Sequence, residues 1–170
     1  MNKKGFTLIE LLATISILAL LMMVAVPNVM STIDKNKQNT YVEDAKRMIT
    51  LAEYEIRSNS SIELPTSGNC IVIPLGSLDL TDFSDGPEGG SYDLENSYVV
   101  IARSGSSYVY YATIVENYDG STRGLPLISR DDLNKESART KVVKGDDLNI
   151  IIPKVGSKLN GYTVSNIIDS

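Results

Sequence analysis

The dominant feature of the hydrophobic pattern is an apolar run from Phe6 to Val26, in which Glu10 is the only ionisable side chain. In a helix, about 21 residues span roughly 30 Å, which is the thickness of the hydrocarbon core of a bilayer. The run therefore predicts a membrane-spanning helix. A carboxylate inside such a segment is costly unless it is paired, so Glu10 is a candidate functional residue that needs a partner.

After Pro27 the pattern becomes amphipathic. Apolar residues recur at steps of three and four as far as Arg57, with charged residues between them. This spacing predicts a helix with one covered face. We expect the helical pattern to run from Phe6 to about Arg57, with weak joints at Pro27-Asn28 and in the polar stretch 36–40. Because Pro27 lacks an N–H, the helix is expected to bend or open there.

Short β-like runs follow once Ser, Pro and Gly residues have broken the helix. The candidate strands are 71–75, 97–103, 108–115, 148–152 and 162–168. The second and third of these are joined by 104–107 and predict a hairpin. Ser129, followed by acidic residues, predicts the N-cap of a short helix reaching about residue 136.

The pattern as a whole predicts an α+β fold, in which a long N-terminal helix packs on a small antiparallel β-sheet. The helix comprises a transmembrane half and an amphipathic half. The expected divisions are a leader at 1–5, the transmembrane helix at 6–27, an amphipathic stalk helix at 28–58 and a globular domain at 59–170.

Composition and charge exclude several classes of protein. The formal net charge of -5 argues against a nucleic-acid-binding surface. The chain has no His and a single cysteine, Cys70, which rules out His-based triads, His/Cys zinc sites and an intramolecular disulfide. Cys70 is expected to be a small buried hydrophobe. Because no glycine-rich phosphate loop is present either, we expect neither an enzyme nor a cofactor.

An acidic loop is the weak candidate for a metal site. Asp79, Asp82 and Asp85, with Glu88 nearby, supply oxygen ligands of the kind that Ca²⁺ prefers. The aspartates are spaced every third residue, which does not match the alternating spacing of an EF-hand. A solvated loop without metal is the favoured interpretation.

The segment Gly5-Phe6-Thr7-Leu8-Ile9-Glu10 follows two lysines and precedes the long apolar helix. It resembles the class III signal peptide of type IV prepilins and pseudopilins, and the likeness covers about the first 30 residues, including Pro27. The resemblance implies that a prepilin peptidase cuts after Gly5 and N-methylates the new N-terminus at Phe6. It also implies that Glu10 and Pro27 serve assembly.

The chemistry of a packed helical filament agrees with this resemblance. Cleavage creates an ammonium group at Phe6, which the Glu10 carboxylate of a neighbouring subunit could pair with inside an apolar bundle. The lysines before the helix place the N-terminus in the cytoplasm and the rest outside. The implied partners are other pilin subunits, the peptidase, a membrane platform protein, an assembly ATPase and, before assembly, membrane lipid.

Three functions remain open from the sequence. The first is a structural subunit of an extracellular type IV pilus serving adhesion, motility or DNA uptake. The second is a pseudopilin of a type II secretion or competence system. The third is a monomeric, membrane-anchored binding domain. Pilus subunits are released by shearing, whereas the other two stay with the cell.

Overall fold

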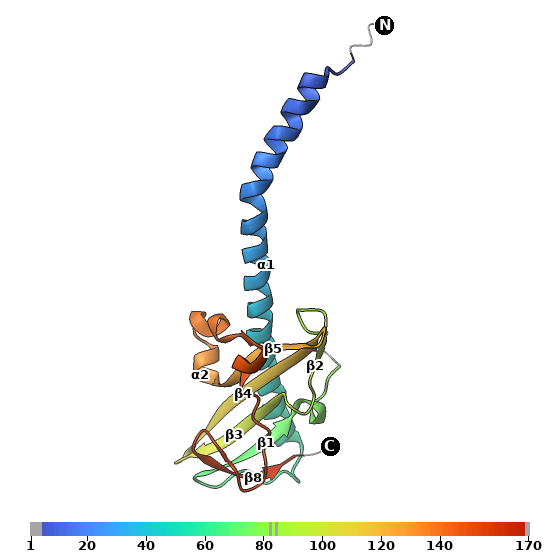
Figure 1. The fold of residues 1–170 in the computed structure, drawn as a ribbon. Helices are drawn as coiled ribbons and strands as arrows, with labels where there is room; N and C mark the ends of the chain where they lie inside the picture. Colours follow the sequence, from blue (N-terminus) through green and yellow to red (C-terminus); the bar gives the residue numbers. More distant parts are fainter. Residues whose placement is uncertain (1–4, 82, 84, 169–170) are drawn as a thin grey trace. The chain divides into compact units, whose positions relative to one another are not determined.

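The structure is a computed structural model that describes residues 5–81, 83 and 85–168. The chain divides into two compact units, the first reaching Asn36 and the second starting at Lys37. The first unit consists of the N-terminal segment and the beginning of helix α1 (Leu8–Ser58); the second contains the rest of α1 and the β-sheet (Figure 1).

The part of α1 in the first unit has no buried residue between Leu8 and Asn36. Its apolar side chains are exposed, as shown by Ile9 and Met23, each at 74%. The helix is long and apolar enough to cross a membrane, and its most apolar 18-residue window has a mean hydropathy of 2.5. This finding fits the membrane-spanning helix expected at 6–27.

α1 continues through Pro27 and through the polar stretch 36–40. The helix therefore does not open at Pro27, where a bend or an opening was expected, and no break marks the weak joint expected at 36–40. Side chains add hydrogen bonds next to the proline. The amide of Asn28 donates to the Val24 carbonyl at 3.1 Å, and the hydroxyl of Thr32 donates to the Asn28 carbonyl at 2.9 Å. Neither bond reaches the Met23 carbonyl, which is the acceptor whose usual backbone donor Pro27 lacks.

The described strands of the second unit form one curled sheet, in the order β6-β5-β4-β3-β1-β8-β7, with β2 beside β4 (Figure 1). All pairs are antiparallel except β1 with β8, which is parallel. The strands are β1 (Asn69–Pro74), β2 (Ser91–Tyr92), β3 (Tyr98–Ser104), β4 (Ser107–Tyr118), β5 (Ser121–Ser129), β6 (Val143–Lys144), β7 (Lys158–Leu159) and β8 (Tyr162–Ile167). The α+β fold expected from the sequence is confirmed.

Short helical turns connect these strands. They are η1 (Leu75–Ser77), α2 (Arg130–Leu133), η2 (Glu136–Lys141) and η3 (Gly145–Leu148). The predicted N-cap at Ser129 is confirmed, because its hydroxyl accepts a hydrogen bond from the Asp132 N–H at 3.1 Å.

The sheet is buried on both faces. On one face lies α1, whose Tyr41, Ala45, Met48 and Ala52 recur at steps of four and three and are fully buried. The opposite face carries a smaller core, made by Cys70, Val72, Tyr98, Val100, Ala102, Leu159 and Val164. Cys70 is thus the buried hydrophobe that the sequence predicts.

The hairpin of β3 and β4 confirms the sequence prediction, with Ser104 opposite Ser107 at its turn. The strand expected at 148–152 is wrong, because the chain leaves η3 at Leu148 and has no strand partner over these residues. β5 was not predicted from the sequence, because it contains Gly124 and Pro126, both poor strand formers.

Candidate functional site

The N-terminal end of α1 is closed by a reciprocal pair of side chains, Thr7 and Glu10. The Glu10 carboxylate accepts hydrogen bonds from the Thr7 backbone N–H at 2.9 Å and from the Thr7 hydroxyl at 2.8 Å. The Glu10 N–H in turn donates to the Thr7 hydroxyl at 3.3 Å. This is a capping box, which satisfies backbone donors that the first helical turn leaves without partners.

The capping box gives Glu10 a partner within its own chain. From the sequence, that partner was expected in a neighbouring subunit, although the Thr-x-x-Glu spacing of Thr7 and Glu10 is a known signature of a helix start. A carboxylate at this end of a helix also interacts favourably with the helix dipole. Thr7 is therefore a site residue that the sequence could have revealed.

The Gly5–Phe6 bond lies just outside this capped helix. Gly5 and Phe6 have no regular secondary structure, and Phe6 is 82% exposed. A methyl group added at Gly5 would meet no atom within 4 Å, so the backbone there is open on its side-chain face. Exposed, non-helical backbone is what a peptidase needs at its cleavage point.

The weak metal candidates are only partly described. Asp82 lies outside the described residues. The Asp79 carboxylate accepts hydrogen bonds from the hydroxyl and the N–H of Thr81, which lower the pKa of Asp79. Among residues 5–81, 83 and 85–168, no three His, Cys, Asp or Glu side chains gather as they would around a metal ion, Asp85 included.

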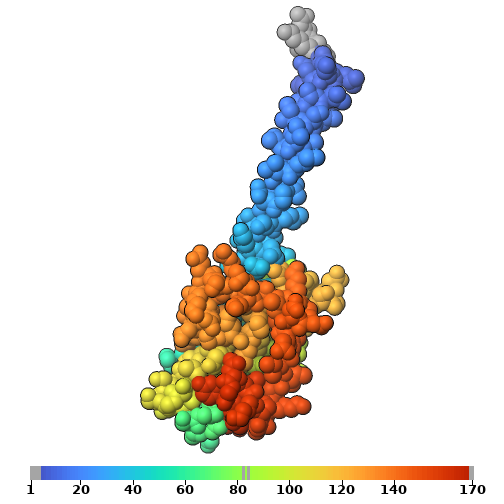
Figure 2. Space-filling model, turned by 60° about the vertical axis from the view of Figure 1, so that its left-hand side comes forward, coloured from blue at the N-terminus to red at the C-terminus, as the bar shows by residue number. Residues whose placement is uncertain are grey.

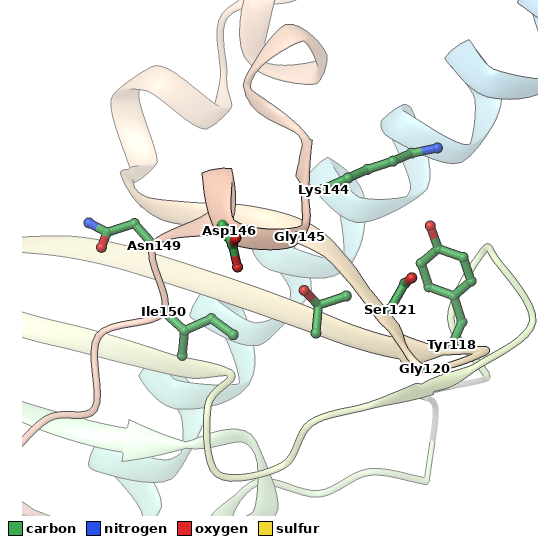
Figure 3. Close-up of a pocket in the computed structure, with 9 residues that line it drawn as sticks. Tyr118, Gly120, Ser121, Lys144, Gly145, Asp146, Asn149 and Ile150 are labelled. Carbon is green, nitrogen blue, oxygen red and sulfur yellow. The ribbon is translucent and has the colours of Figure 1, made fainter.

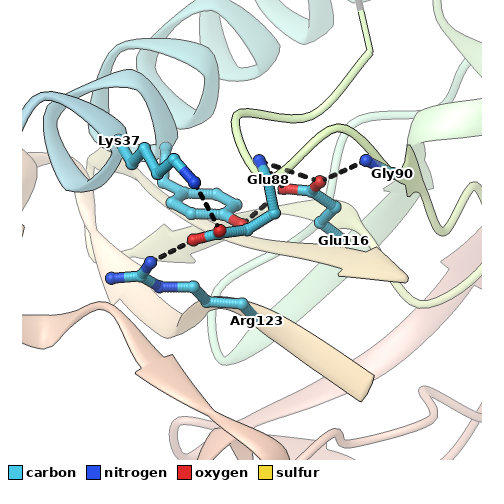
Figure 4. Close-up of polar contacts among 6 residues, drawn as sticks. Lys37, Glu88, Gly90, Glu116 and Arg123 are labelled. Carbon is cyan, nitrogen blue, oxygen red and sulfur yellow. Dashed lines mark hydrogen bonds and ion pairs between the residues drawn. The ribbon is translucent and has the colours of Figure 1, made fainter. Parts of the chain in front are cut away.

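Glu88, at the end of the same loop, forms ion pairs instead. Its carboxylate contacts the Lys37 ammonium at 2.7 Å and the Arg123 guanidinium (Figure 4). Burial alone would raise the pKa of Glu88, but the hydrogen bonds and charges of Lys37 and Arg123 lower it overall. The loop is thereby tied both to α1 and to β5.

A second carboxylate, Glu116 on β4, is fully buried beneath this loop. It accepts hydrogen bonds from the Tyr41 hydroxyl at 2.5 Å, the Gly90 N–H at 2.8 Å and the Glu88 N–H at 3.1 Å (Figure 4). Burial and the hydrogen bond to Glu116 raise the pKa of Tyr41 strongly, so the phenol stays a neutral donor. The buried charges thus have hydrogen-bonding partners and hold the loop against the helix.

A surface hollow of the second unit lies on the side of the β4–β5 turn that faces η3 (Figure 3). It is open and has a volume of about 670 Å³. Its lining includes Tyr118, Ser121, Lys144, Asp146 and Asn149, none of which is buried. Figure 3 shows the Lys144 and Asn149 side chains pointing in different directions, so the hollow lacks the convergent polar groups of a binding site.

Residues 1–26 match the prokaryotic N-terminal methylation motif, which is the type IV prepilin signature. This match confirms the resemblance based on Gly5, Phe6 and Glu10, and it ends one residue before Pro27. No curated protein and no solved structure matches the chain.

Proposed function

We propose that this chain is a structural subunit of an extracellular type IV pilus. It inserts in the membrane as a prepilin, is cleaved after Gly5, and polymerises through its N-terminal helix. The observation that carries the proposal is the conjunction of the methylation motif at residues 1–26 with a helix whose apolar side chains are exposed along its first turns.

The exposed helix requires two successive environments. Burying one Leu or Ile side chain is worth about 1.5–3 kcal/mol, and the stretch from Leu8 to Ile33 exposes many such side chains. Such a segment does not remain in water. The bilayer covers it before assembly, and the neighbouring helices of the filament core cover it afterwards.

Glu10 exchanges partners during this transfer. In the single chain its carboxylate accepts hydrogen bonds from Thr7. Cleavage after Gly5 places an ammonium group on Phe6, and a charged donor makes a hydrogen bond roughly twice as strong as a neutral one. In the filament, the Glu10 carboxylate of one subunit pairs with the Phe6 ammonium of a neighbour, which fixes the axial register.

The remaining partners and the topology follow from the same function. A membrane-embedded prepilin peptidase cuts after Gly5 and methylates Phe6. A platform protein and a cytoplasmic ATPase then extract the subunit from the lipid. Pro27 lies in the exposed part of α1, where it weakens the helix so that packed helices can adjust in the filament.

Shearing cells that produce the chain tests this function. A pilus subunit is recovered in the sheared fraction as filaments visible by electron microscopy, with this chain as their main component by mass spectrometry. A chain that stays entirely with the cells would instead be a pseudopilin or a monomeric anchored domain.

A further inference from the structure

The segment that follows η3 exposes an unusual number of aliphatic side chains. Ile150, Ile151 and Ile152 are consecutive, and their exposed fractions are 40%, 42% and 66%. Val155, shortly beyond them, is 64% exposed. Three exposed apolar residues in a row are a departure from ordinary surface composition that calls for a functional reason.

These isoleucines have the sequence of a strand but lack a strand's partners. A run of β-branched residues is typical of a strand that is covered on both faces. Within the described part of the chain, no strand pairs with residues 149–153. The Ile151 carbonyl accepts a hydrogen bond from the Tyr98 hydroxyl at 2.8 Å, which holds the segment over the sheet face opposite α1.

A surface hollow extends the exposed aliphatic area. Ile152 and Pro153 line a cavity of about 340 Å³ together with Leu94, which is 45% exposed. We define the isoleucine patch as Leu94, Ile150, Ile151, Ile152 and Val155. In the space-filling view, the orange-red segment around residue 150 lies on the surface of the second unit (Figure 2).

A smaller set of exposed apolar residues lies at the end of α1. Tyr54 is 70% exposed, and Leu64, in the loop after the helix, is 44% exposed. Glu63 beside it is also exposed. We define the helix-end surface as Tyr54, Glu63 and Leu64. Within the described residues, these two surfaces account for all the exposed large hydrophobics of the second unit.

We propose that the isoleucine patch of one copy of this chain docks on the helix-end surface of the next copy. This inference rests on the proposed function, which brings copies together. Because α1 and the isoleucines cover opposite faces of the sheet, the contact joins two different surfaces. A contact between unlike surfaces is heterologous, and it propagates into an open filament rather than closing a dimer.

The charges around the two surfaces favour the helix-end surface of a second copy as the partner of the isoleucine patch. Lys154 lies between Ile152 and Val155 of the isoleucine patch and is exposed. Lys158, which follows it in β7, is exposed as well. Glu63 supplies an exposed carboxylate on the other surface. Opposite charges at the rim of an apolar contact select its partner and register.

Cysteine cross-linking of the full chain in sheared filaments tests the contact. Tyr54→Cys combined with Ile152→Cys is expected to give a ladder of covalent multimers after mild oxidation. Each single variant is expected to remain monomeric, since native Cys70 is buried. Dimers from Ile152→Cys alone would show that the isoleucine patch pairs with itself, and the absence of cross-links in the double variant would show that another surface covers it; either result overturns the proposal.

Exchanging the charges of Lys154 and Glu63 in the cross-linking experiment gives a second test of the contact. Lys154→Glu is expected to lower the cross-linked fraction by about threefold, as for one exposed ion pair. Glu63→Lys added to Lys154→Glu is expected to restore it. Equal cross-linking in all three chains would contradict the assigned partner surface.

The test separates this contact from the proposed function. Filaments of the double cysteine variant that form no cross-link would refute the contact and leave the pilus assignment standing. A multimer ladder from membranes in which electron microscopy finds no filaments would support the contact and refute the extracellular pilus.

Discussion

At the scale of single residues, the proposed function gives the Glu10 carboxylate a different partner in each of two states. In the single chain it caps α1 through Thr7. In the proposed filament it neutralises an ammonium that exists only after cleavage at Gly5. If the proposal holds, processing supplies the stronger partner, and assembly is coupled to cleavage without any change in the fold of the second unit.

Glu10→Lys is expected to leave cleavage after Gly5 intact but to abolish filaments, because the lysine places a second cation next to the Phe6 ammonium. Intact mass and electron microscopy of the sheared fraction measure the two effects.

Thr7→Ala is the matched control. It removes the hydroxyl of the capping box, which costs about 1 kcal/mol of helix stability, but it keeps the Glu10 carboxylate for the neighbouring subunit. Filaments at normal abundance are expected. If Thr7→Ala abolished assembly as completely as Glu10→Lys, the cap rather than the ion pair would be the essential feature.

Glu88 carries a second residue-scale prediction. Glu88→Gln is expected to destabilise the folded chain at pH 7 by about 3 kcal/mol, because it breaks ion pairs with Lys37 and the buried Arg123. Thermal unfolding of the full chain in detergent, followed by circular dichroism, measures the difference.

The pH dependence of this effect has a definite sign. The pKa of Glu88 in the folded chain lies below its ordinary value of 4.5, so its ionisation stabilises the fold above pH 4.5. That contribution is lost as the pH falls through the folded-state pKa, where Glu88→Gln should approach the stability of the unchanged chain. A difference independent of pH would mean that packing, and not charge, causes the loss.

At the scale of elements, the sequence pattern predicted a helix or hairpin correctly where the signal lay within a few neighbouring residues. The steps of three and four in α1, the turn of the β3–β4 hairpin and the cap at Ser129 all follow from neighbouring residues. The parallel pairing of β1 with β8 does not, because residues 69 and 163 are far apart in the sequence. Long-range pairing leaves no signal in either strand alone.

The same reasoning explains the failure at residues 148–152. Their composition predicts a strand, and the described chain provides none to pair with it. If a second copy covers the segment, the error reflects the assembly and not the propensity of the residues. The candidate site residues differ in the same way. Gly5, Phe6 and Glu10 are predicted from a short sequence motif, whereas Glu116 and its hydrogen-bond partners are brought together only by the fold.

Hydrogen exchange should show whether a second copy covers this segment in the filament. The amides of Ile150, Ile151 and Ile152 are expected to exchange rapidly in the detergent-solubilised chain and more slowly, by about tenfold or more, in filaments. Exchange measured by mass spectrometry compares the two states. Val100, which is buried on central strand β3, is the control and should be protected in both; equal exchange of the isoleucines would contradict the docking of this segment.

Gly124 is the residue on which the pairing of β4 with β5 depends. A Cβ at this position would lie 1.9 Å from the Ile114 carbonyl oxygen, so Gly124→Ala is expected to destabilise the sheet by about 3 kcal/mol. Gly76→Ala, whose added atom would meet nothing closer than 3.4 Å, is expected to be neutral. Equal melting temperatures for the two variants would refute the close approach of these strands.

At the scale of the whole molecule, the chain combines an apolar helix long enough to cross a membrane with a unit built around a β-sheet. The methylation motif occupies residues 1–26, and the two units meet in sequence at Asn36 and Lys37. In the proposed function, the first unit provides the same helix to membrane and filament. In the proposed contact, the second unit provides the surfaces through which adjacent copies recognise one another.

The central claim is that this chain is processed and polymerised as a pilus subunit. Mass spectrometry of the N-terminal peptide from sheared filaments tests it most directly. The account predicts a chain that starts at Phe6 and carries one N-methyl group. A chain from the same fraction that retains Met1 would contradict it.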